Sequence, residues 1–394
     1  MKNALAILGL ILLTVAEVLR VYFIMPFPGS QYKNTLDAAY WIGNNIMWIR
    51  ILLLCLIAFP LFQLFRSSGK WIKLFAVILA GMYMVVFYFF NYRFLAETMF
   101  YQPRHLNFSS AVENKIAVDK QVLGVAINGE TKAYPIQLIG YHHQVRDIVG
   151  GKPVMVTYCT VCRTGRVFSP FVNGKNEEFR LVGMDHFNAM FEDASTKSWW
   201  RQVSGEAVAG PLKGQQLLEI PSRQMSLAAW LRLYPTSLVM HPDSTFKKKY
   251  EDLEGYDKGK LTNKLEKRDT ASWKDKSWVI GIKSGSSAKA IDWNLLVRKR
   301  FIQDSLPELP FIVVVESDST SFHSYSRNFN GMVLQFQLLD TAKSLLMIDK
   351  NTSSLWDQEG HCLEGKLQGS KLSVVQSYQE YWHSWRTFNP YTKR

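Results

Sequence analysis

The sequence predicts three N-terminal transmembrane helices followed by an exported α+β domain, mainly antiparallel β, made of two tandem homologous units. Long apolar stretches with few charges are confined to the first 95 residues. Beyond residue 105 the pattern changes to short β-like runs separated by turn residues, and the same residue order returns about 157 positions later. We therefore expect a membrane domain (1–95), a first β-rich unit (105–240), a connection (241–277) and a second, degenerate unit (278–394).

Each of the three apolar stretches is long enough to cross a bilayer as a helix. Leu74–Tyr92 has 19 consecutive uncharged residues, which suits the thickness of a hydrocarbon core. Ala4–Met25 remains apolar after Arg20 and has no small-residue cleavage pattern before Glu17, so we expect an uncleaved helix rather than a signal peptide. We expect Glu17 to pair with Arg50 or Arg20 and to hold two helices together. The predicted helices span about 4–25, 46–65 and 72–92.

The two connections between these helices differ in charge. Arg66, Lys70 and Lys73 lie in the second connection, whereas the first has Lys33 against Asp37. Basic loops stay in the cytoplasm, so we expect the second connection and the N-terminus there. Three spans then place the rest of the chain in the periplasm or outside the cell, with the protein in the plasma (inner) membrane.

The net charge indicates a membrane protein rather than a nucleic-acid-binding protein. The formal net charge is +13, and the first 95 residues contain eight basic and two acidic side chains. The remainder has a mild basic excess without an Arg-rich stripe. The expected partners are therefore the lipid bilayer and a membrane or exported protein, and not nucleic acid.

Turn signals recur in the same order in both parts of the exported domain. Asn128-Gly129 and Asn173-Gly174 are typical of two-residue hairpin turns, because both residue types tolerate positive φ angles. Asn173-Gly174 matches Asn330-Gly331 at a spacing of 157. Leu227–Leu233 is expected to form a short helix. Agreement in order, spacing and residue type over more than a hundred positions predicts an internal duplication.

Positions that both units share are expected to hold the fold, and positions unique to one unit are where function is expected. The motif Asp193-x-x-Thr196-x-Ser198-x-Trp200 recurs in the second unit and is typical of a turn capped by side chains beside a buried Trp. Cysteine and histidine pairs occur in the first unit alone. Each of these residues is followed here in parentheses by the residue at the matching position of the second unit: Cys159 (Glu316), Cys162 (Ser319), His142 (Lys299) and His143 (Arg300).

The Cys159-x-x-Cys162 motif is compatible with three chemistries. The thiols could exchange with other disulfides, with Arg163 lowering one thiol pKa. The thiolates could bind a soft metal, Cu or Zn. The pair could also be an inert disulfide of an exported domain that binds a ligand between its two units. Strand-like runs precede and follow the motif, at Pro153–Tyr158 and Arg166–Val172, and this setting is typical of a metal knuckle rather than a thioredoxin-like site.

Further metal ligands must come from elsewhere in the first unit. The nearest candidates are His142, His143, Asp147 and His186. Three cysteines lie outside the membrane, an odd number, and Cys362 is expected to be a small buried residue.

Several motifs resemble a bacterial family catalogued as domain of unknown function 3179. They are Gly150-Gly151-Lys152-Pro153-Val154, Thr157-Tyr158-Cys159-x-x-Cys162-x-Thr164-Gly165 and Thr196-x-Ser198-x-Trp200. The resemblance covers roughly residues 120–391 and implies an exported or membrane-attached protein without an established activity. The positions that match the family's motifs are His142, Asp147, Cys159, Cys162, Thr164, Asn188, Asp193 and Trp200.

The sequence departs from that family pattern around the cysteines. His143 stands where the family has Glu, Arg146 where it has Asn, Thr160 where it has Pro and Arg163 where it has Gly. The loss of Pro and Gly argues against a standard metal knuckle, and Arg163 favours thiolate or anion chemistry. Our leading hypothesis is a Cys159/Cys162 site that works with His142 to bind or transfer Cu or Zn. A thiol–disulfide oxidoreductase and a non-catalytic domain with a structural disulfide are the alternatives.

Overall fold

The chain folds into two compact units, each made from two separate segments. The computed structural model describes residues 2–341 and 344–394. Unit 1 comprises the chain up to Tyr101 together with Val172–Gln216, and unit 2 comprises Gln102–Phe171 together with Leu217–Arg394. Packing therefore groups part of the predicted first β-rich unit with the N-terminal helices.

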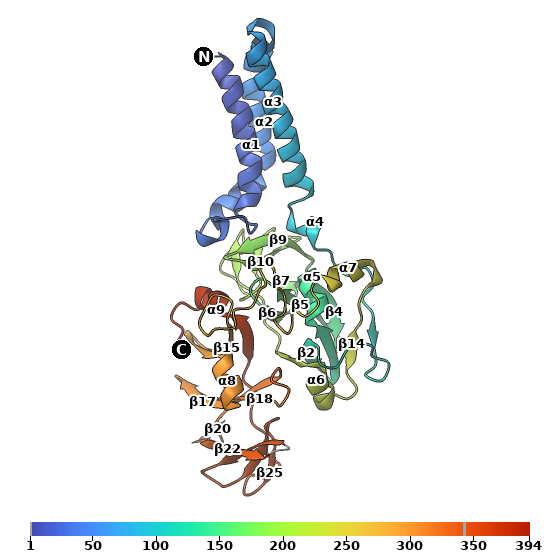
Figure 1. Cartoon of the computed structure of the whole chain (residues 1–394), viewed down its shortest axis with the longest axis vertical. Helices are drawn as coiled ribbons and strands as arrows, with labels where there is room; N and C mark the ends of the chain where they lie inside the picture. Colours follow the sequence, from blue (N-terminus) through green and yellow to red (C-terminus); the bar gives the residue numbers. More distant parts are fainter. Residues whose placement is uncertain (1, 342–343) are drawn as a thin grey trace. The chain divides into compact units, whose positions relative to one another are not determined.

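Unit 1 contains three helices that are long and apolar enough to cross a membrane: α1 (Lys2–Tyr22), α2 (Leu36–Ser67) and α3 (Lys70–Tyr92). They lie side by side (Figure 1). Helix α1 ends before the predicted residue 25, because Pro26 disfavours a helical residue ahead of it. Helix α2 begins ahead of the predicted residue 46, with Asp37 in its first turn, where an acidic side chain favours helix formation.

A buried ion pair joins these helices. Glu17 is fully buried, and Arg50 donates to both of its carboxylate oxygens, from Nε at 2.5 Å and from Nη2 at 2.8 Å. Asn91 of α3 donates to the same carboxylate at 3.0 Å and accepts from Arg20 at 2.7 Å. The predicted pairing of Glu17 with Arg50 is confirmed, and it extends to the third helix.

A four-stranded antiparallel sheet completes unit 1, in the order β12-β11-β10-β9. The Met184 amide donates to the Ile24 carbonyl at 2.6 Å, and Tyr40 packs edge-to-face on Trp199 with ring centroids 5.0 Å apart. The segment after α1 is thus hydrogen-bonded to this sheet, and a side chain of α2 packs on it. The unit 1 elements after α3 are α4 (Ala96–Met99), β8 (Lys175–Asn176), β9 (Phe179–Asp185), β10 (Asn188–Asp193), β11 (Trp199–Arg201) and β12 (Ala207–Ala209), and the short helix η1 (Ser30–Tyr32) follows α1.

The shared Asp-x-x-Thr-x-Ser-x-Trp motif forms a capped turn at both of its positions. In unit 1 the Asp193 carboxylate accepts from Thr196 Oγ1 at 2.7 Å and from Trp200 Nε1 at 2.9 Å. In unit 2 Asp349 accepts from the indole of the buried Trp356, also at 2.9 Å. The predicted side-chain capping is therefore present at both positions.

Unit 2 is mainly antiparallel β with short helices. Two of its sheets belong to the earlier part of the chain, in the orders β1-β14-β3-β2-β13 and β4-β5-β6, and the later part contributes β16-β15-β26, β17-β18-β19 and β22-β23-β24-β25. The elements before residue 252 are β1 (Phe108–Ser109), β2 (Gln121–Ile127), β3 (Glu130–Pro135), α5 (Ile136–His142), β4 (Gln144–Val149), β5 (Lys152–Cys159), β6 (Thr164–Phe168), β13 (Ser222–Ser226), α6 (Leu227–Leu233), β14 (Leu238–Met240), η2 (Ser244–Phe246) and α7 (Lys247–Glu251), with β7 (Phe171–Val172) at the unit boundary.

The later elements follow the same order as the earlier ones. The stretch from β2 to α6 and the stretch from β15 to α9 contain strands and short helices in the same order along the chain. We call these the first series (121–233) and the second series (278–388). The second series contains β15 (Trp278–Ser284), β16 (Ser287–Asp292), α8 (Trp293–Lys299), β17 (Phe301–Leu306), β18 (Leu309–Val315), β19 (Phe322–Ser326), β20 (Asn328–Phe329), β21 (Met332–Val333), β22 (Phe336–Thr341), β23 (Ser344–Asp349), β24 (Leu355–Asp357), β25 (Cys362–Glu364), β26 (Ser377–Tyr381) and α9 (Trp382–Phe388).

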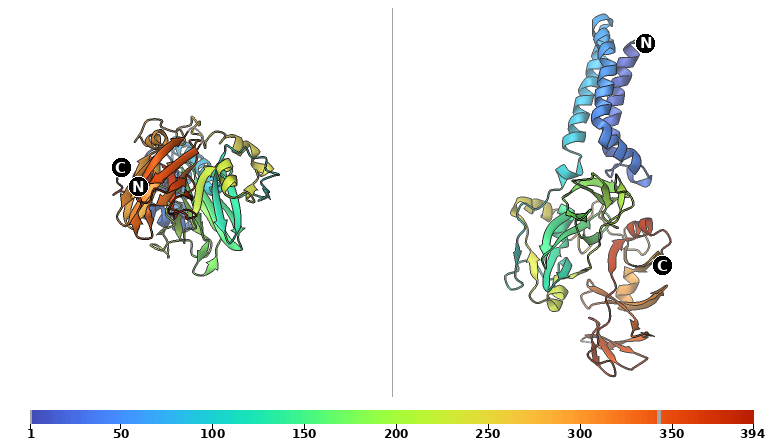
Figure 2. Two further views of the ribbon diagram at one scale, coloured as in Figure 1. Left: turned by 90° about the horizontal axis from the view of Figure 1, so that it is seen from below. Right: turned by 180° about the vertical axis from the view of Figure 1, so that it is seen from behind.

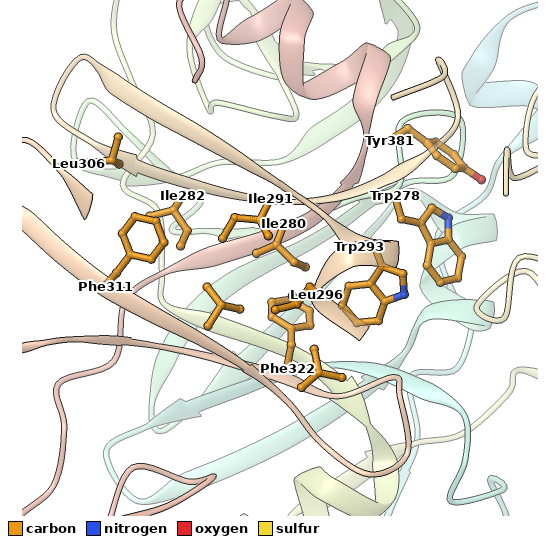
Figure 3. Close-up of a cluster of buried hydrophobic side chains, with 12 residues drawn as sticks. Trp278, Ile280, Ile282, Ile291, Trp293, Leu296, Leu306, Phe311, Phe322 and Tyr381 are labelled. Atoms are coloured by element: carbon orange, nitrogen blue, oxygen red, sulfur yellow. The ribbon is translucent and has the colours of Figure 1, made fainter. Parts of the chain in front are cut away.

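Predicted turns and the predicted short helix are present. Asn128 and Gly129 both have positive φ, at 49° and 84°, as a two-residue hairpin turn requires. The helix α6 spans Leu227–Leu233 as expected. The second series has its own core, which includes Trp278 and is formed by side chains from β15, β16, α8, β17, β18, β19 and β26 (Figure 3). Figure 2 shows the antiparallel ribbons of this part in two further views.

The connection 241–277 is largely exposed but also contributes buried residues to unit 2. Its Lys247-Lys248-Lys249 run is exposed, but Tyr250, Tyr256 and Asp257 are buried. Its buried aromatic residues contact residues that are distant in sequence. Tyr256, for example, donates to the carbonyl of Thr160 at 2.9 Å.

Candidate functional site

The Cys-x-x-Cys motif forms a turn between two buried antiparallel strands. Strand β5 ends at Cys159, which pairs with Thr164 at the start of β6. The turn between them, residues 160–163, places Arg163 in a left-handed conformation with φ of 57°. The strand–turn–strand setting predicted from the sequence is thus present, and we call residues 159–164 the knuckle.

Both knuckle thiols are fully buried and lie in hydrogen-bond contact with each other. They are free thiols in this structure. Burial raises the pKa of Cys162 well above its ordinary value, and the neighbouring Cys159 raises it further, while the Lys276 ammonium and a hydrogen bond from Ser384 oppose the rise. Cys162 is therefore neutral near pH 7 unless a cation displaces its proton.

Three carbonyls of the knuckle accept hydrogen bonds from distant segments. Tyr256 Oη donates to Thr160 O at 2.9 Å, and the Tyr381 amide donates to Cys162 O at 3.0 Å. Val161 O accepts from both Lys276 Nζ and His383 Nε2. The knuckle is consequently held by the 241–277 segment on one side and by β26 and α9 of the second series on the other.

The ammonium of Lys276 acts electrostatically on the thiols and partly offsets the rise that burial causes in the pKa of Cys162. Burial lowers the pKa of Lys276, and the two cysteines partly offset that decrease. Its ammonium also lies 4.6 Å from the ring centroid of Tyr381. Sequence reasoning missed Lys276, because it is one of many lysines in a segment without periodicity.

Arg163 makes an extensive set of buried contacts away from the thiols. Its guanidinium is fully buried and donates to Gln379 Oε1 at 3.0 and 2.8 Å, and to the Asp257 carbonyl at 2.9 Å. It also stacks on Trp278, 3.8 Å from the ring centroid. The side chain thereby joins residues of the first series to residues of the second.

The two histidines follow α5 and differ in their bonding. His142 Nε2 lies 2.7 Å from Tyr250 Oη. His143 Nδ1 lies 2.9 Å from the carbonyl oxygen of Tyr158, the residue before Cys159, and must therefore carry the proton of that bond. Burial lowers the pKa of His143 to about 4, against the opposing effect of that hydrogen bond. The His143 ring is thus neutral near pH 7, with a lone pair on Nε2.

The other residues predicted from the sequence occupy separate surroundings. Asp147 accepts from Lys132 and from Tyr134 Oη on β3, and Thr164 is buried beside Cys159 on the ladder. Four further candidates belong to unit 1. His186 lies 2.5 Å from Asp185, Asn188 bonds to Gln202 and Val203, and Asp193 and Trp200 form the capped turn.

A group with metal-ligating atoms occurs elsewhere, in the β24–β25 turn. Among the residues that the structure describes, Asp357, Glu359 and His361 offer ligand atoms within 4.8 Å of one another. Arg232 already pairs with Glu359 at 2.6 Å, which competes with metal binding there. The knuckle cysteines and His143 do not form such a group of three in the described residues. Sequence reasoning missed this cluster because the spacing of its three residues matches no known metal-binding motif.

These features define a class of protein: an N-terminal bundle of three apolar helices joined to a mainly antiparallel β domain that holds a buried dithiol. The chain belongs to the family described as "Protein of unknown function (DUF3179)", whose model matches residues 102–392. No curated protein and no solved structure matches the chain.

Proposed function

We propose that this protein is a membrane-anchored exported protein whose knuckle binds or transfers a soft metal ion, Cu or Zn. The observation that carries this proposal is the mutual contact of two buried thiols beside the half-buried Lys276. Thiolate sulfur is the ligand that Cu(I) and Zn prefer in proteins. Burial suits a metal site, whereas it hinders a thiol that must reach a partner disulfide.

The charges at the knuckle favour a monovalent ion. A metal that displaces the protons of Cys159 and Cys162 leaves two negative charges in a buried place. The Lys276 ammonium offsets one of them and a monovalent metal offsets the other. With Cu(I), the two thiolates, the Lys276 ammonium and the metal have a total charge of zero. With a divalent ion, the total charge is positive and is costly to bury.

His143 is better prepared than His142 to serve as a third ligand. Its Nδ1 donates to the Tyr158 carbonyl, and this arrangement fixes the tautomer in which Nε2 can bind a metal. The Nε2 of His142 lies 2.7 Å from Tyr250 Oη, a hydroxyl that can donate or accept, so this bond does not fix the His142 tautomer in the same way. Because the His143 ring and the two sulfurs do not form a group within 4.8 Å, the ring would join the metal by moving towards the knuckle.

We also propose that the two series arose by duplication and that the second series completes the site of the first. The common order of elements and the paired capped turns support this proposal. Opposite Cys159, the second series has Glu316, which is buried and bonds to His323 and to Arg232 at 2.6 Å each. The second knuckle is thereby filled by an ion pair and has lost the thiols, while Tyr381 and His383 support the first knuckle.

Metal analysis of the full-length protein tests the proposed function. The protein would be purified in detergent without chelator and without oxygen, loaded with Cu(I) or Zn(II), and dialysed. We expect about one equivalent of metal in the wild type, as one pair of thiolates implies. Cys159→Ser and Cys162→Ser should lose it, whereas Cys362→Ser should retain it, because Cys362 is a buried cysteine outside the knuckle.

Two further comparisons test the supporting residues. His143→Gln should weaken metal retention more than His142→Gln does. Lys276→Met should weaken it more than Lys274→Met, which changes the same charge at an exposed position two residues away. Stoichiometric metal that persists in the Cys159→Ser/Cys162→Ser double variant would refute the proposal.

A thiol–disulfide oxidoreductase is the second candidate, because thiols in mutual contact can close into a disulfide. This reading requires metal-free protein and a measurable reduction potential for the pair. It also requires that Cys162→Ser trap mixed disulfides with exported proteins, while Cys362→Ser does not. The raised pKa of Cys162 predicts slow attack by that thiol at neutral pH, which counts against this candidate.

A further inference from the structure

Trp273 and Trp382 form a two-walled aromatic corner in unit 2. Their ring centroids are 5.1 Å apart and their planes meet at 83°. The guanidinium carbon of Arg394 lies 5.0 Å from the centroid of Trp273 and 4.7 Å from that of Trp382. Both distances lie within the range of about 6 Å over which an aromatic face attracts a cation. The corner thus already holds a cation supplied by the chain itself.

Both walls of the corner are fixed by their surroundings. Trp382 begins α9 and packs with Val279 and Trp385 in a hydrophobic core, and Trp273 packs against the same core. Trp273 has φ of 64°, a left-handed backbone conformation that is strained for a bulky residue. Packing keeps Trp273 in this strained conformation, and its ring therefore stands at a defined angle to Trp382.

The position of Arg394 is set by its neighbour in the chain. The Lys393 amide donates to Ala288 O at 3.0 Å, and its carbonyl accepts from the Ala290 amide at 2.8 Å. These bonds tie the backbone to β16 and leave the Arg394 side chain exposed over the corner. The guanidinium can therefore leave the rings without loss of the backbone bonds.

The surface around the corner has room for more than a single side chain. A hollow of about 460 Å³ includes Trp382 in its lining, and another of about 560 Å³ includes Trp273. The charged residues beside the rings balance, because Asp269 and Asp275 oppose Lys274 and Arg386, and Arg386 pairs with Asp275 at 2.7 Å. Because the net charge around the rings is near zero, the attraction of the two aromatic faces for a cation determines which ligand binds.

We propose that the aromatic corner is a binding site for an arginine side chain of a partner polypeptide, and that Arg394 occupies it in the free protein. The corner holds the guanidinium of Arg394, so the geometry of the two rings suits a guanidinium from another chain as well. Arg394 then acts as a tethered competitor, which a partner must displace. This proposal is independent of metal binding at the knuckle.

Peptide binding to the full-length protein in detergent tests the proposal. The probe is a dye-labelled acetyl-Gly-Arg-Gly amide, followed by fluorescence anisotropy. Arg394→Gln should bind the probe at least about fivefold more tightly than the wild type, because a tethered competitor acts at millimolar effective concentration. Lys366→Gln removes the same charge from another exposed position and should leave the affinity unchanged.

The corner itself is tested in the Arg394→Gln background. Trp273→Ala should abolish binding, whereas Trp273→Phe, which keeps an aromatic face, should weaken it. Peptides with Gln in place of Arg should not compete. Failure of Arg394→Gln to bind the probe, or binding that survives Trp273→Ala, would overturn the proposal. Competition by choline at lower concentrations than by unlabelled arginine peptide would overturn the polypeptide assignment and indicate a lipid headgroup.

Discussion

Gly124 lies directly against the ring of Trp230, so that a Cβ atom built on Gly124 would stand 2.3 Å from two ring carbons. The second series repeats this arrangement with Gly281 and Trp385, at 2.1 Å. In each case a strand glycine makes room for the indole of the short helix at the end of its series. The close approach explains why both residue types recur at both places.

Substitution of either glycine tests this packing. Gly124→Ala and Gly281→Ala should each lower the free energy of unfolding by about 1–3 kcal/mol or more, because the ring must shift within a packed core. Thermal unfolding of the full-length protein by near-UV circular dichroism measures the effect. Gly43→Ala is the control, since no atom lies within 4 Å of its Cβ position and a helix tolerates alanine well. Equal stability of all three variants would contradict the argument.

The ion pair between Glu17 and Arg50 predicts a strong effect of removing one partner. Glu17→Gln leaves Arg50 without its carboxylate and should destabilise the helical bundle by about 3–5 kcal/mol. The Glu17→Gln/Arg50→Gln double variant should recover much of that loss, because no charge remains unpaired. Resistance of the bundle to unfolding in detergent measures both. A double variant as unstable as the single one would show that the pair is not the cause.

His383 should make the stability of unit 2 sensitive to acid. Burial, together with the charge of Lys276, lowers the pKa of His383 to about 3, against the opposing hydrogen bond to Val161 O. The unfolded chain binds a proton near the ordinary histidine pKa of about 6.5, and the folded chain does not. Stability should therefore fall as the pH drops from about 6.5 towards 3.

The matched comparison is His383→Gln, whose amide can still donate to Val161 O. Between about pH 7 and about pH 5, the wild type should lose about 1–2 kcal/mol more stability than this variant. Urea unfolding at the two pH values gives the difference. Identical losses in the two proteins would assign the acid sensitivity to other groups.

The charges of the second helix connection predict the orientation in the membrane. A reporter that is active only outside the cytoplasm should be active when fused after the last residue and inactive when inserted after Ser68. Replacing Arg66, Lys70 and Lys73 together with Gln should reduce this difference. Activity of the insertion after Ser68 in the wild type would reverse the proposed topology.

Local sequence signals predicted much of the fold. Asn-Gly pairs identified hairpin turns because few other residues accept positive φ, and the uncharged stretch at Leu74–Tyr92 identified a helix by length alone. The Asp193 and Asp349 turns followed from residues only a few positions apart. In each case the determining interactions lie within one element or one turn.

The surroundings of the knuckle could not be predicted in this way. Lys276 and Tyr256 contact it from more than ninety positions away, and neither follows a helical or strand period. Arg163 looked like an electrostatic neighbour of the thiols because it adjoins Cys162 in sequence, yet its side chain reaches Gln379, 216 positions later. Long-range polar contacts of this kind leave no local pattern.

The same long-range contacts bear on how the protein matures. The carbonyl of Cys162 accepts a hydrogen bond from the Tyr381 amide of β26, so the knuckle cannot reach its final form until the chain has emerged as far as Tyr381. Contacts between residues so distant in sequence form late and slowly. During that interval Cys159 and Cys162 remain accessible to oxidants, and to Cys362 as soon as it emerges. Formation of the proposed thiolate site therefore requires that these thiols stay protected until β26 and α9 have docked.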